Sequence, residues 1–267
     1  MEEVIAVIGA GVIGSAIVRS LLKSEYEGKI VATRRSLDKL KELEGLGATI
    51  TRNNKEAARC SDIIFICVKP NDVRLVLEEI ANEVRGKLVI STAATVPIDF
   101  YKKMVPRARF VRTMPNIAVL VQESFTAYCC DEDVTPEDKQ KIESVLSCMG
   151  VCREVEEKYM DAITGFSGSG PAFISTIIEG LLYAGLKVGL PRDLALYGAA
   201  QTVIGTAKLV VEGRKHPAEI RDMVTTPGGV TIEGIYELEG SEIRTALIRA
   251  VEKATEKCAT IRSHIGK

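Results

Sequence analysis

A glycine-rich turn near the start of the chain constrains the fold more than any other feature. An apolar run at residues 4–8 is followed directly by Gly9-Ala10-Gly11-Val12-Ile13-Gly14, where a helical pattern begins. In this context Gly9 makes the tight turn, Gly11 lets the backbone approach a pyrophosphate, and Gly14 lets the helix pack closely on the strand. Free backbone N–H groups and the positive end of the helix dipole hold the phosphates. We therefore predict a dinucleotide-binding turn; a glycine-rich turn without a ligand is the alternative.

Short β-branched runs alternate with helical stretches through the first half of the chain. The runs are Val4–Ile8, Ile30–Ala32, Ala48–Thr51, Ile63–Val68, Leu88–Ser91 and Arg109–Arg112. Apolar strands separated by amphipathic helices are typical of a parallel sheet covered on both faces. Two further strands, Thr126–Cys130 and Val151–Val155, are expected to complete it, with a helix between them that Thr135 caps. We predict a doubly wound α/β domain over residues 1–157.

Beyond Glu157 apolar residues recur at helical spacing with little strand signal, which predicts an all-helical domain over residues 158–267. In the last segment one helix face carries Ile243, Leu247, Ala250, Ala254, Cys258 and Ile261. Two central helices are rich in small residues, namely Gly180, Ala184, Gly185 and Gly189, then Gly198, Ala199, Ala200, Gly205 and Ala207.

Those glycines need a packing reason, because each costs about 1 kcal/mol relative to alanine inside a helix. One interpretation is tight packing within one chain, and the other is helices interlocked between two subunits. A helical domain of this size is easier to stabilise by pairing. We therefore favour a homodimer.

Composition excludes several classes of protein. Lys and Arg number 35, Asp and Glu number 36, and the net charge is −1, with 46% of the residues apolar and 27% charged. This is ordinary for a soluble globular protein. A near-neutral balance argues against a nucleic-acid partner, which needs a basic face to neutralise phosphates. The longest unbroken apolar run, Ile63–Val68, is far shorter than the ~20 residues of a membrane helix, so we expect no membrane span.

The N-terminus and the cysteines predict a cytoplasmic protein. Met1-Glu2-Glu3 leads directly into an apolar strand and lacks the features of a signal peptide. The seven cysteines include no CxxC pair, and only two histidines accompany them. We expect reduced, mostly packing thiols and no metal site.

The end of the second strand selects the dinucleotide. A carboxylate there accepts hydrogen bonds from the ribose hydroxyls of NAD, whereas arginine accommodates the 2′-phosphate of NADP. Here the strand ends Val31-Ala32-Thr33-Arg34-Arg35, without an acid. Thr33 can hydrogen-bond the phosphate, and Arg34 or Arg35 can pair with it; a solvated arginine pair is the alternative. We predict a marked preference for NADPH over NADH.

Several motifs then occur in one order along the chain. They are Val68-Lys69-Pro70, Ser167-Gly168-Ser169-Gly170-Pro171-Ala172, Gly189-Leu190-Pro191-Arg192, and Thr225-Thr226-Pro227-Gly228-Gly229-Val230-Thr231 with its flanks at 221–224 and 232–234. Together they resemble the signature of the pyrroline-5-carboxylate reductases, over essentially the whole chain. The resemblance implies an N-terminal Rossmann domain and a helical dimerisation domain, often in a decamer of five dimers. It also implies reduction of 1-pyrroline-5-carboxylate, a cyclic imine carboxylate, to proline with NADPH or sometimes NADH, the last step of proline synthesis.

The resemblance also assigns residues to the site. It places Asn54 near the adenosine. Along the cofactor it places Val68, Lys69, Pro70, Ala93 and Ala94, and near the substrate it places Glu157, Val230 and Thr231. Two positions depart from the family pattern. Asn116-Ile117-Ala118 stands where the family often has Asn-Thr-Pro, which affects contacts near the nicotinamide, and Met223 stands where it often has Asn or Gln.

The glycine pair before Val230 is suited to binding a carboxylate. Backbone N–H groups of Gly229, Val230 and Thr231, with the hydroxyl of Thr226, can converge on it, and glycines permit the backbone angles of such a nest. An ordinary proline-glycine turn between helices is the alternative.

Catalysis is expected to depend on positioning and the exclusion of water. Hydride attacks C5 of the imine, and water can protonate its nitrogen near neutral pH, so the enzyme needs only to orient the iminium. Thr231 is our candidate for the contact with that nitrogen. Neither histidine is assigned to catalysis, because His216 precedes Pro217 at a helix start and His264 is near the C-terminus.

Two lysines have rival interpretations. Lys69 follows a sheet strand and could donate a proton, but we assign it to cofactor binding. Lys187 could act as an acid or base, as a helical-domain lysine does in related two-domain dehydrogenases, but it stands near a helix end, where the helix dipole favours a cation, and we prefer that explanation. Three functions remain open. The protein is a pyrroline-5-carboxylate reductase, or a related enzyme such as a β-hydroxyacid dehydrogenase or another cyclic-imine reductase, or a non-catalytic NADP sensor.

Overall fold

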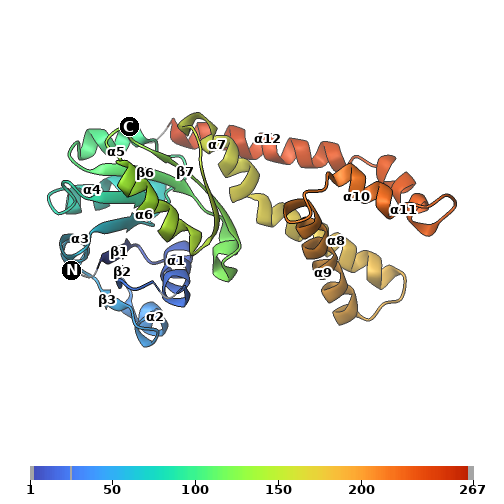
Figure 1. Ribbon diagram of the computed structural model, residues 1–267, viewed down its shortest axis with the longest axis horizontal. Coiled ribbons are helices and arrows are strands. Elements are labelled where there is room, and N and C mark those ends of the chain that lie inside the picture. The colour runs from blue at the N-terminus through green and yellow to red at the C-terminus, as the bar shows by residue number, and fades with distance from the viewer. Residues whose placement is uncertain (1–2, 25, 264–267) are drawn as a thin grey trace. The chain divides into compact units, whose positions relative to one another are not determined.

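The computed structural model describes residues 3–24 and 26–263 (Figure 1). Their contacts divide the chain into two compact units. The first contains residues up to Gly170 together with those from Val251 onward, and the second spans Pro171–Ala250. The contacts thus group residues 158–170 with the sheet, whereas the sequence pattern groups them with the helices that follow.

The first unit contains an eight-stranded sheet in the order β3-β2-β1-β4-β5-β6-β7-β8 (Figure 1). Its strands are β1 Val4–Ile8, β2 Lys29–Thr33, β3 Thr49–Thr51, β4 Ile63–Ile66, β5 Leu88–Ser91, β6 Arg109–Met114, β7 Ser124–Cys130 and β8 Gly150–Glu154. The strands from β1 to β6 pair in parallel. This confirms the predicted doubly wound α/β fold.

The last two strands correct the expectation of a wholly parallel sheet. β7 pairs antiparallel with β6, and β8 pairs in parallel with β7. The link over residues 115–123 contains only the short helix η3, Ile117–Val121, and a parallel crossover needs roughly a dozen residues or more. β7 must therefore return alongside β6, while the longer link through α6, Pro136–Ser147, lets β8 run parallel to β7.

Helices cover both faces of the sheet. Ile5, Val7 and Phe65 point into a core closed by α1, Val12–Lys23, and α6. Ala6, Ile8 and Ile64 point into a second core, closed by the helices α3 Asn54–Cys60, α4 Val73–Ile80 and α5 Ile98–Met104. Burial on both faces explains why these strands are continuous apolar runs rather than alternating ones.

Short helical segments complete the first unit. They are η1 Leu37–Leu40, α2 Lys41–Gly45, η2 Pro70–Asp72, η4 Glu157–Tyr159, α7 Met160–Ile163 and the π-helix η5 Thr164–Gly168. The predicted cap of α6 is confirmed as a capping box. Thr135 Oγ1 accepts from the N–H of Asp138 at 3.1 Å, and the Asp138 carboxylate accepts from the N–H of Thr135 at 3.1 Å.

The second unit is helical, as predicted. Its helices are α8 Gly170–Lys187, α9 Arg192–Val211, α10 Pro217–Met223 and α11 Val230–Glu239, and α12 Ile243–Arg262 begins in it and ends in the first unit. Among its described residues the buried side chains are Leu182, Ala195, Ala199 and Ile220. Large apolar side chains are instead exposed, such as Tyr197 at 71%. The unit therefore has little core of its own.

Close packing within the chain explains one of the helix glycines. A Cβ on Gly185 would lie 2.7 Å from the Cβ of Ala195, so α8 and α9 touch there. A Cβ on Gly180, Gly198 or Gly205 would meet nothing within 4 Å. The contacts within the chain thus give no packing reason for these three glycines.

One described helix, α9, is long and apolar enough to cross a membrane, judged by length and composition alone. Charged and polar residues interrupt its sequence, so it contains no long unbroken apolar run. Its 18-residue apolar window is only 11% buried. The apolar side chains of α9 are therefore largely exposed within the single chain.

Candidate functional site

The glycine-rich turn has the geometry that its sequence predicts. Gly9 has φ +84°, and a Cβ there would overlap Val68 Cγ1. A Cβ on Gly14 would lie 2.9 Å from the carbonyl oxygen of Gly9. These contacts confirm the turn-forming role of Gly9 and the packing role of Gly14. Gly11 differs, since the nearest atom to its Cβ would be 3.8 Å away, and its role toward a pyrophosphate stays a prediction.

A cavity of about 570 Å³ opens beside this turn, at the carboxyl ends of β1, β2 and β4. The predicted residues that line it are Gly9, Gly11, Thr33, Arg34, Arg35, Asn54, Val68 and Lys69. Ala10, Val12, Ile13 and Gly14 lie in the adjoining turn and α1, and Pro70 begins η2. Ala93 and Ala94 follow β5 and do not line this cavity. Ligands of open α/β sheets bind at this edge.

Sequence reasoning missed nine residues that line the cavity. Five of them are Ser36, Lys39, Arg52, Asp72 and Glu79, and the others are Ile8, Cys67, Leu75 and Val76. Arg52 could have been found, because it directly follows β3 and the carboxyl ends of parallel strands meet at one edge. Glu79 is in α4, and no signal in the sequence marks which face of that helix borders the cavity. Arg34, Arg35, Lys39 and Arg52 make the end of the cavity beside β2 and β3 strongly basic.

Thr33 has a different role from the one its sequence position predicts. It is only 1% exposed, and its hydroxyl donates to Asn54 Oδ1 at 2.6 Å while accepting from the N–H of Gly9 at 3.3 Å. Its single proton is therefore used within the protein. We assign Thr33 to positioning Asn54 rather than to contact with a phosphate.

The two predicted arginines also differ from each other. The guanidinium of Arg34 donates to the carbonyl oxygen of Ala10 at 3.1 Å, which fixes it beside the glycine-rich turn. Arg35 is exposed at the cavity. Arg34 therefore presents an oriented donor set, and Arg35 a charge that is free to follow a ligand.

The cysteines behave as packing residues. All seven are free thiols. Burial raises the pKa of Cys67, which lines the cavity, to about 12, and burial does the same for Cys129 and Cys130. These thiols stay protonated near neutral pH, as the sequence analysis expects. Among the described residues, no group of three or more His, Cys, Asp or Glu side chains is arranged to hold a metal.

The predicted substrate turn is in the second unit. Gly228 has φ +66°, and a Cβ on Gly229 would overlap Thr226 Oγ1. Gly229 is the N-cap of α11 and no side chain caps that end. Val230 is 91% exposed. The N–H of Gly229 donates to the carbonyl oxygen of Thr226 at 3.0 Å, so of the three predicted donors only the N–H groups of Val230 and Thr231, at the start of α11, remain for a ligand. The turn thus brings together Thr226, Gly229, Val230 and Thr231.

Glu157 is in the first unit, where its carboxylate has partners. Its Oε1 accepts from the N–H of Ile98 at 2.8 Å and from the guanidinium of Arg112 at 3.2 Å. Arg112, 2% exposed, also pairs with Asp161 at 2.9 Å, and Asp161 pairs with Arg262 of α12 at 2.8 Å. This network joins the end of α12 to β6. A substrate contact by Glu157 stays a prediction.

Asn116, at the first departure from the family pattern, connects the sheet to the π-helix. Its Nδ2 donates to the carbonyl oxygen and hydroxyl of Ser167 at 3.2 and 3.3 Å, and its Oδ1 accepts from the N–H of Ala118 at 3.0 Å. A Cβ on Gly168 would lie 2.6 Å from Met114 Cε. The sequence did not predict this link between two distant motifs.

The remaining candidates have structural explanations. His216 Nδ1 accepts from the N–H of Ala218 at 3.2 Å, which confirms its capping role at α10. His264 lies outside the described residues. Lys187 is in the last turn of α8, as predicted.

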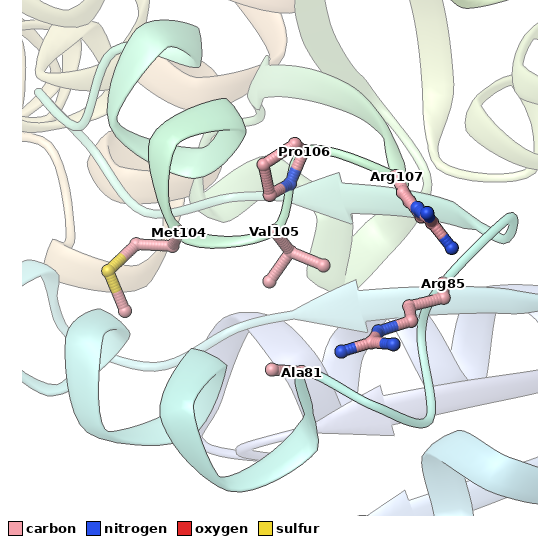
Figure 2. Close-up of a pocket in the computed structure, with 6 residues that line it drawn as sticks. All are labelled: Ala81, Arg85, Met104, Val105, Pro106 and Arg107. Atoms are coloured by element: carbon pink, nitrogen blue, oxygen red, sulfur yellow. The ribbon is translucent and has the colours of Figure 1, made fainter.

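A second cavity of about 330 Å³ contains none of the predicted site residues. Figure 2 shows that its arginines, Arg85 and Arg107, come from the loops that precede β5 and β6. It therefore lies at the amino ends of these strands, opposite to the edge where dinucleotides bind.

A doubly wound sheet with this turn and basic cavity, joined to a helical unit, defines a two-domain oxidoreductase of the Rossmann type. Residues 4–95 match the family described as "NADP oxidoreductase coenzyme F420-dependent", and residues 157–261 match "Pyrroline-5-carboxylate reductase dimerisation". A pyrroline-5-carboxylate reductase from Methanosarcina acetivorans is 41% identical, over 96% of this chain and 97% of its own. Human pyrroline-5-carboxylate reductase 2 is 37% identical, over 96% of this chain and 83% of its own. The chain belongs to the pyrroline-5-carboxylate reductase family, which confirms the resemblance.

Solved structures agree with this assignment. The reductase from Coxiella burnetii has a TM-score of 0.90 at 33% identity, covering 96% of this chain and 97% of its own. The Plasmodium falciparum enzyme, solved with NADP bound, has a TM-score of 0.88 at 31% identity and covers 97% of both chains. An imine reductase from Streptomyces aurantiacus is only 15% identical at a TM-score of 0.58, over 97% of this chain and 95% of its own, and shares the fold alone.

Proposed function

We propose that this protein reduces 1-pyrroline-5-carboxylate to proline with NADPH. The observation that carries the proposal is similarity at 41% identity, over nearly the whole of both chains, to a protein named pyrroline-5-carboxylate reductase. The Thr225–Thr231 turn and the basic cavity agree with it. Residues 1–157 would bind the coenzyme, and residues 158–267 would bind the substrate and a second subunit.

The basic cavity supports NADPH as the preferred coenzyme. Arg34, Arg35, Lys39 and Arg52 line the end of the cavity where β2 stops, and β2 carries no acid there. Cations at this position suit a 2′-phosphate. NADH, which lacks that phosphate, would serve less well. The related enzyme from Plasmodium falciparum was solved with NADP bound.

The turn before α11 supports recognition of a carboxylated substrate. The N–H groups of Val230 and Thr231 are at the start of an uncapped helix, where an anion is favoured, whereas the N–H of Gly229 is bonded to the carbonyl oxygen of Thr226 and shapes the turn. Thr231 would hydrogen-bond the ring nitrogen. Bound NADPH would supply a hydride, which is two electrons and one hydrogen, to C5. The ring nitrogen would take up one proton from the solvent, so that 1-pyrroline-5-carboxylate, NADPH and H⁺ give proline and NADP⁺. The protein's own contribution is to orient the iminium and exclude water.

The exposed apolar surface of the second unit supports a homodimer. Tyr197 and Val211 of α9 are 71% and 74% exposed, and this region matches a dimerisation family. Large apolar side chains that are exposed in such number on a single chain are typical of a protein–protein interface. A second copy would cover α9, and a decamer of five dimers would follow the family's pattern.

We also propose that the protein is cytoplasmic and has no membrane or nucleic-acid partners.

Coenzyme oxidation with three substrates tests the activity. NADPH consumption is followed with pyrroline-5-carboxylate, with piperideine-6-carboxylate, and in reverse with NADP⁺ and 3-hydroxy acids. We expect the highest kcat/KM with pyrroline-5-carboxylate, with proline as the product. A higher kcat/KM with either competitor would favour a different reductase. NADPH binding without turnover on any substrate would favour a sensor.

A further inference from the structure

A chain of hydrogen bonds crosses the adenosine end of the cavity. The N–H of Gly9 donates to Thr33 Oγ1 at 3.3 Å, the hydroxyl of Thr33 donates to Asn54 Oδ1 at 2.6 Å, and Asn54 Nδ2 donates to Glu79 Oε2 at 2.8 Å. The residues come from the glycine-rich turn, the end of β2, the start of α3 and the last turn of α4. All four line the cavity. Glu79 is thus the outer end of this chain.

The donors and acceptors fix the orientation of the Asn54 amide. The Thr33 hydroxyl has two lone pairs, so after accepting from Gly9 it can either donate to or accept from Asn54, and the orientation of the amide is set at its other end. There the Asn54 amino group faces Glu79, whose ionised carboxylate only accepts. A flipped amide would place two acceptors together at Glu79. One amide proton of Asn54 remains for a ligand in the cavity.

The charge of Glu79 has a second consequence. The cavity also contains Arg34, Arg35, Lys39 and Arg52, which attract a 2′-phosphate, whereas Glu79 and Asp72 are acids. A carboxylate near the ribose repels a 2′-phosphate and accepts from a free 2′-hydroxyl. Rossmann enzymes that use NAD have such a carboxylate at the end of β2, where this chain has none.

We infer that Glu79 positions the Asn54 amide for the adenosine ribose and that its carboxylate preserves the use of NADH by opposing the 2′-phosphate. This inference rests on the proposed function. Glu79 is a positioning and specificity-determining residue, and it supplies from α4 the acid that β2 lacks. The arginines and Glu79 together set the ratio of NADPH to NADH use.

Three variants separate positioning from charge. Glu79→Gln keeps an acceptor for Asn54 but removes the charge, and Glu79→Ala removes both. Glu78→Gln is the matched control, because Glu78 is the exposed neighbour on α4 that does not line the cavity. Binding of NADPH and NADH is measured by nicotinamide fluorescence, together with kcat and KM for each coenzyme at saturating pyrroline-5-carboxylate, and with Tm as a check on folding.

We expect Glu79→Gln to raise the ratio of kcat/KM for NADPH to that for NADH by roughly threefold, because one partly screened repulsion is lost. Glu79→Ala should weaken NADH binding by about tenfold, the scale of one hydrogen bond to a charged group. It should weaken NADPH binding less, because the lost repulsion offsets the lost positioning. Values of kcat should stay unchanged, and Glu78→Gln should match the wild type in every measurement.

Two results would overturn the inference. If both Glu79 variants have the coenzyme ratio of Glu78→Gln, Glu79 does not set specificity. If Glu79→Gln and Glu79→Ala weaken both coenzymes equally while Tm falls, Glu79 has only a structural role. In either case the wild type still reduces pyrroline-5-carboxylate, so the proposed function stands. A wild type that binds neither coenzyme would overturn both.

Discussion

At the scale of single residues, the site is defined by which polar atoms already have partners. Thr33 is buried and its hydroxyl donates a hydrogen bond to Asn54, whereas Arg35 is exposed at the cavity. The first acts on a ligand only through its neighbour, and the second can meet a ligand directly. This distinction cannot be read from the sequence, where Thr33 and Arg35 both stand within three residues of the end of the predicted strand Ile30–Ala32.

The arginine pair gives the first prediction. Replacing both Arg34 and Arg35 by Ala should lower kcat/KM for NADPH by about tenfold or more, because charge-assisted bonds to the phosphate are lost. The value for NADH should change little. Steady-state kinetics with both coenzymes make the measurement, with Arg59→Ala on the exposed side of α3 as the control. An unchanged preference for NADPH would exclude the pair from recognition of the phosphate.

Thr231 gives the second prediction. Thr231→Ala should lower kcat by about tenfold, the scale of one hydrogen bond to a charged iminium. NADPH binding should stay nearly intact, because Thr231 is in the substrate turn and not in the basic cavity. Single-turnover rates and fluorescence titration separate the two effects. Unchanged turnover would remove Thr231 from the mechanism.

At the scale of elements, the turn between β1 and α1 combines packing and binding in neighbouring glycines. Gly14 has no room for a Cβ, whereas a Cβ on Gly11 would make only an ordinary van der Waals contact, 3.8 Å from the carbonyl oxygen of Gly9. Substitution by alanine should therefore separate the two roles.

Gly14→Ala should lower the free energy of unfolding by about 1–3 kcal/mol, the usual cost of overpacking. Gly11→Ala should leave stability nearly unchanged but weaken coenzyme binding, because its Cβ would stand where the pyrophosphate approaches. Urea denaturation and NADPH titration of both variants make the comparison. Full NADPH affinity in a folded Gly11→Ala variant would contradict the predicted role of this turn.

The sequence predicted element types well and some relationships between elements poorly. Strands such as Val4–Ile8 and Leu88–Ser91 were predicted with their observed bounds, because burial on both faces makes them continuous apolar runs. The antiparallel direction of β7 was missed, although the link over residues 115–123 is too short for a parallel crossover. Glu79 was missed because the face of α4 that meets the cavity is set by tertiary packing, which no local pattern records.

At the scale of the whole molecule, the second unit is incomplete by itself. Its large apolar side chains are exposed, and several of its helix glycines have no neighbour within the chain. The proposed dimer supplies both a cover for the apolar surface and a reason for the glycines.

Disrupting that surface gives the fourth prediction. Tyr197→Glu places a charge on the exposed apolar side of α9 and should shift the protein toward monomer in light scattering coupled to gel filtration. Leu46→Glu is the control, because Leu46 is 50% exposed in the first unit. We expect Leu46→Glu to keep the wild-type mass. A Tyr197→Glu variant with unchanged mass would show that α9 is not in the interface.

The most direct test of the whole account is a crystal structure of the protein with NADP⁺ and a stable, carboxylated analogue of the ring. We predict the 2′-phosphate among Arg34, Arg35, Lys39 and Arg52, and the analogue's carboxylate on the N–H groups of Val230 and Thr231. An analogue bound away from that helix start, with the turn vacant, would contradict the account.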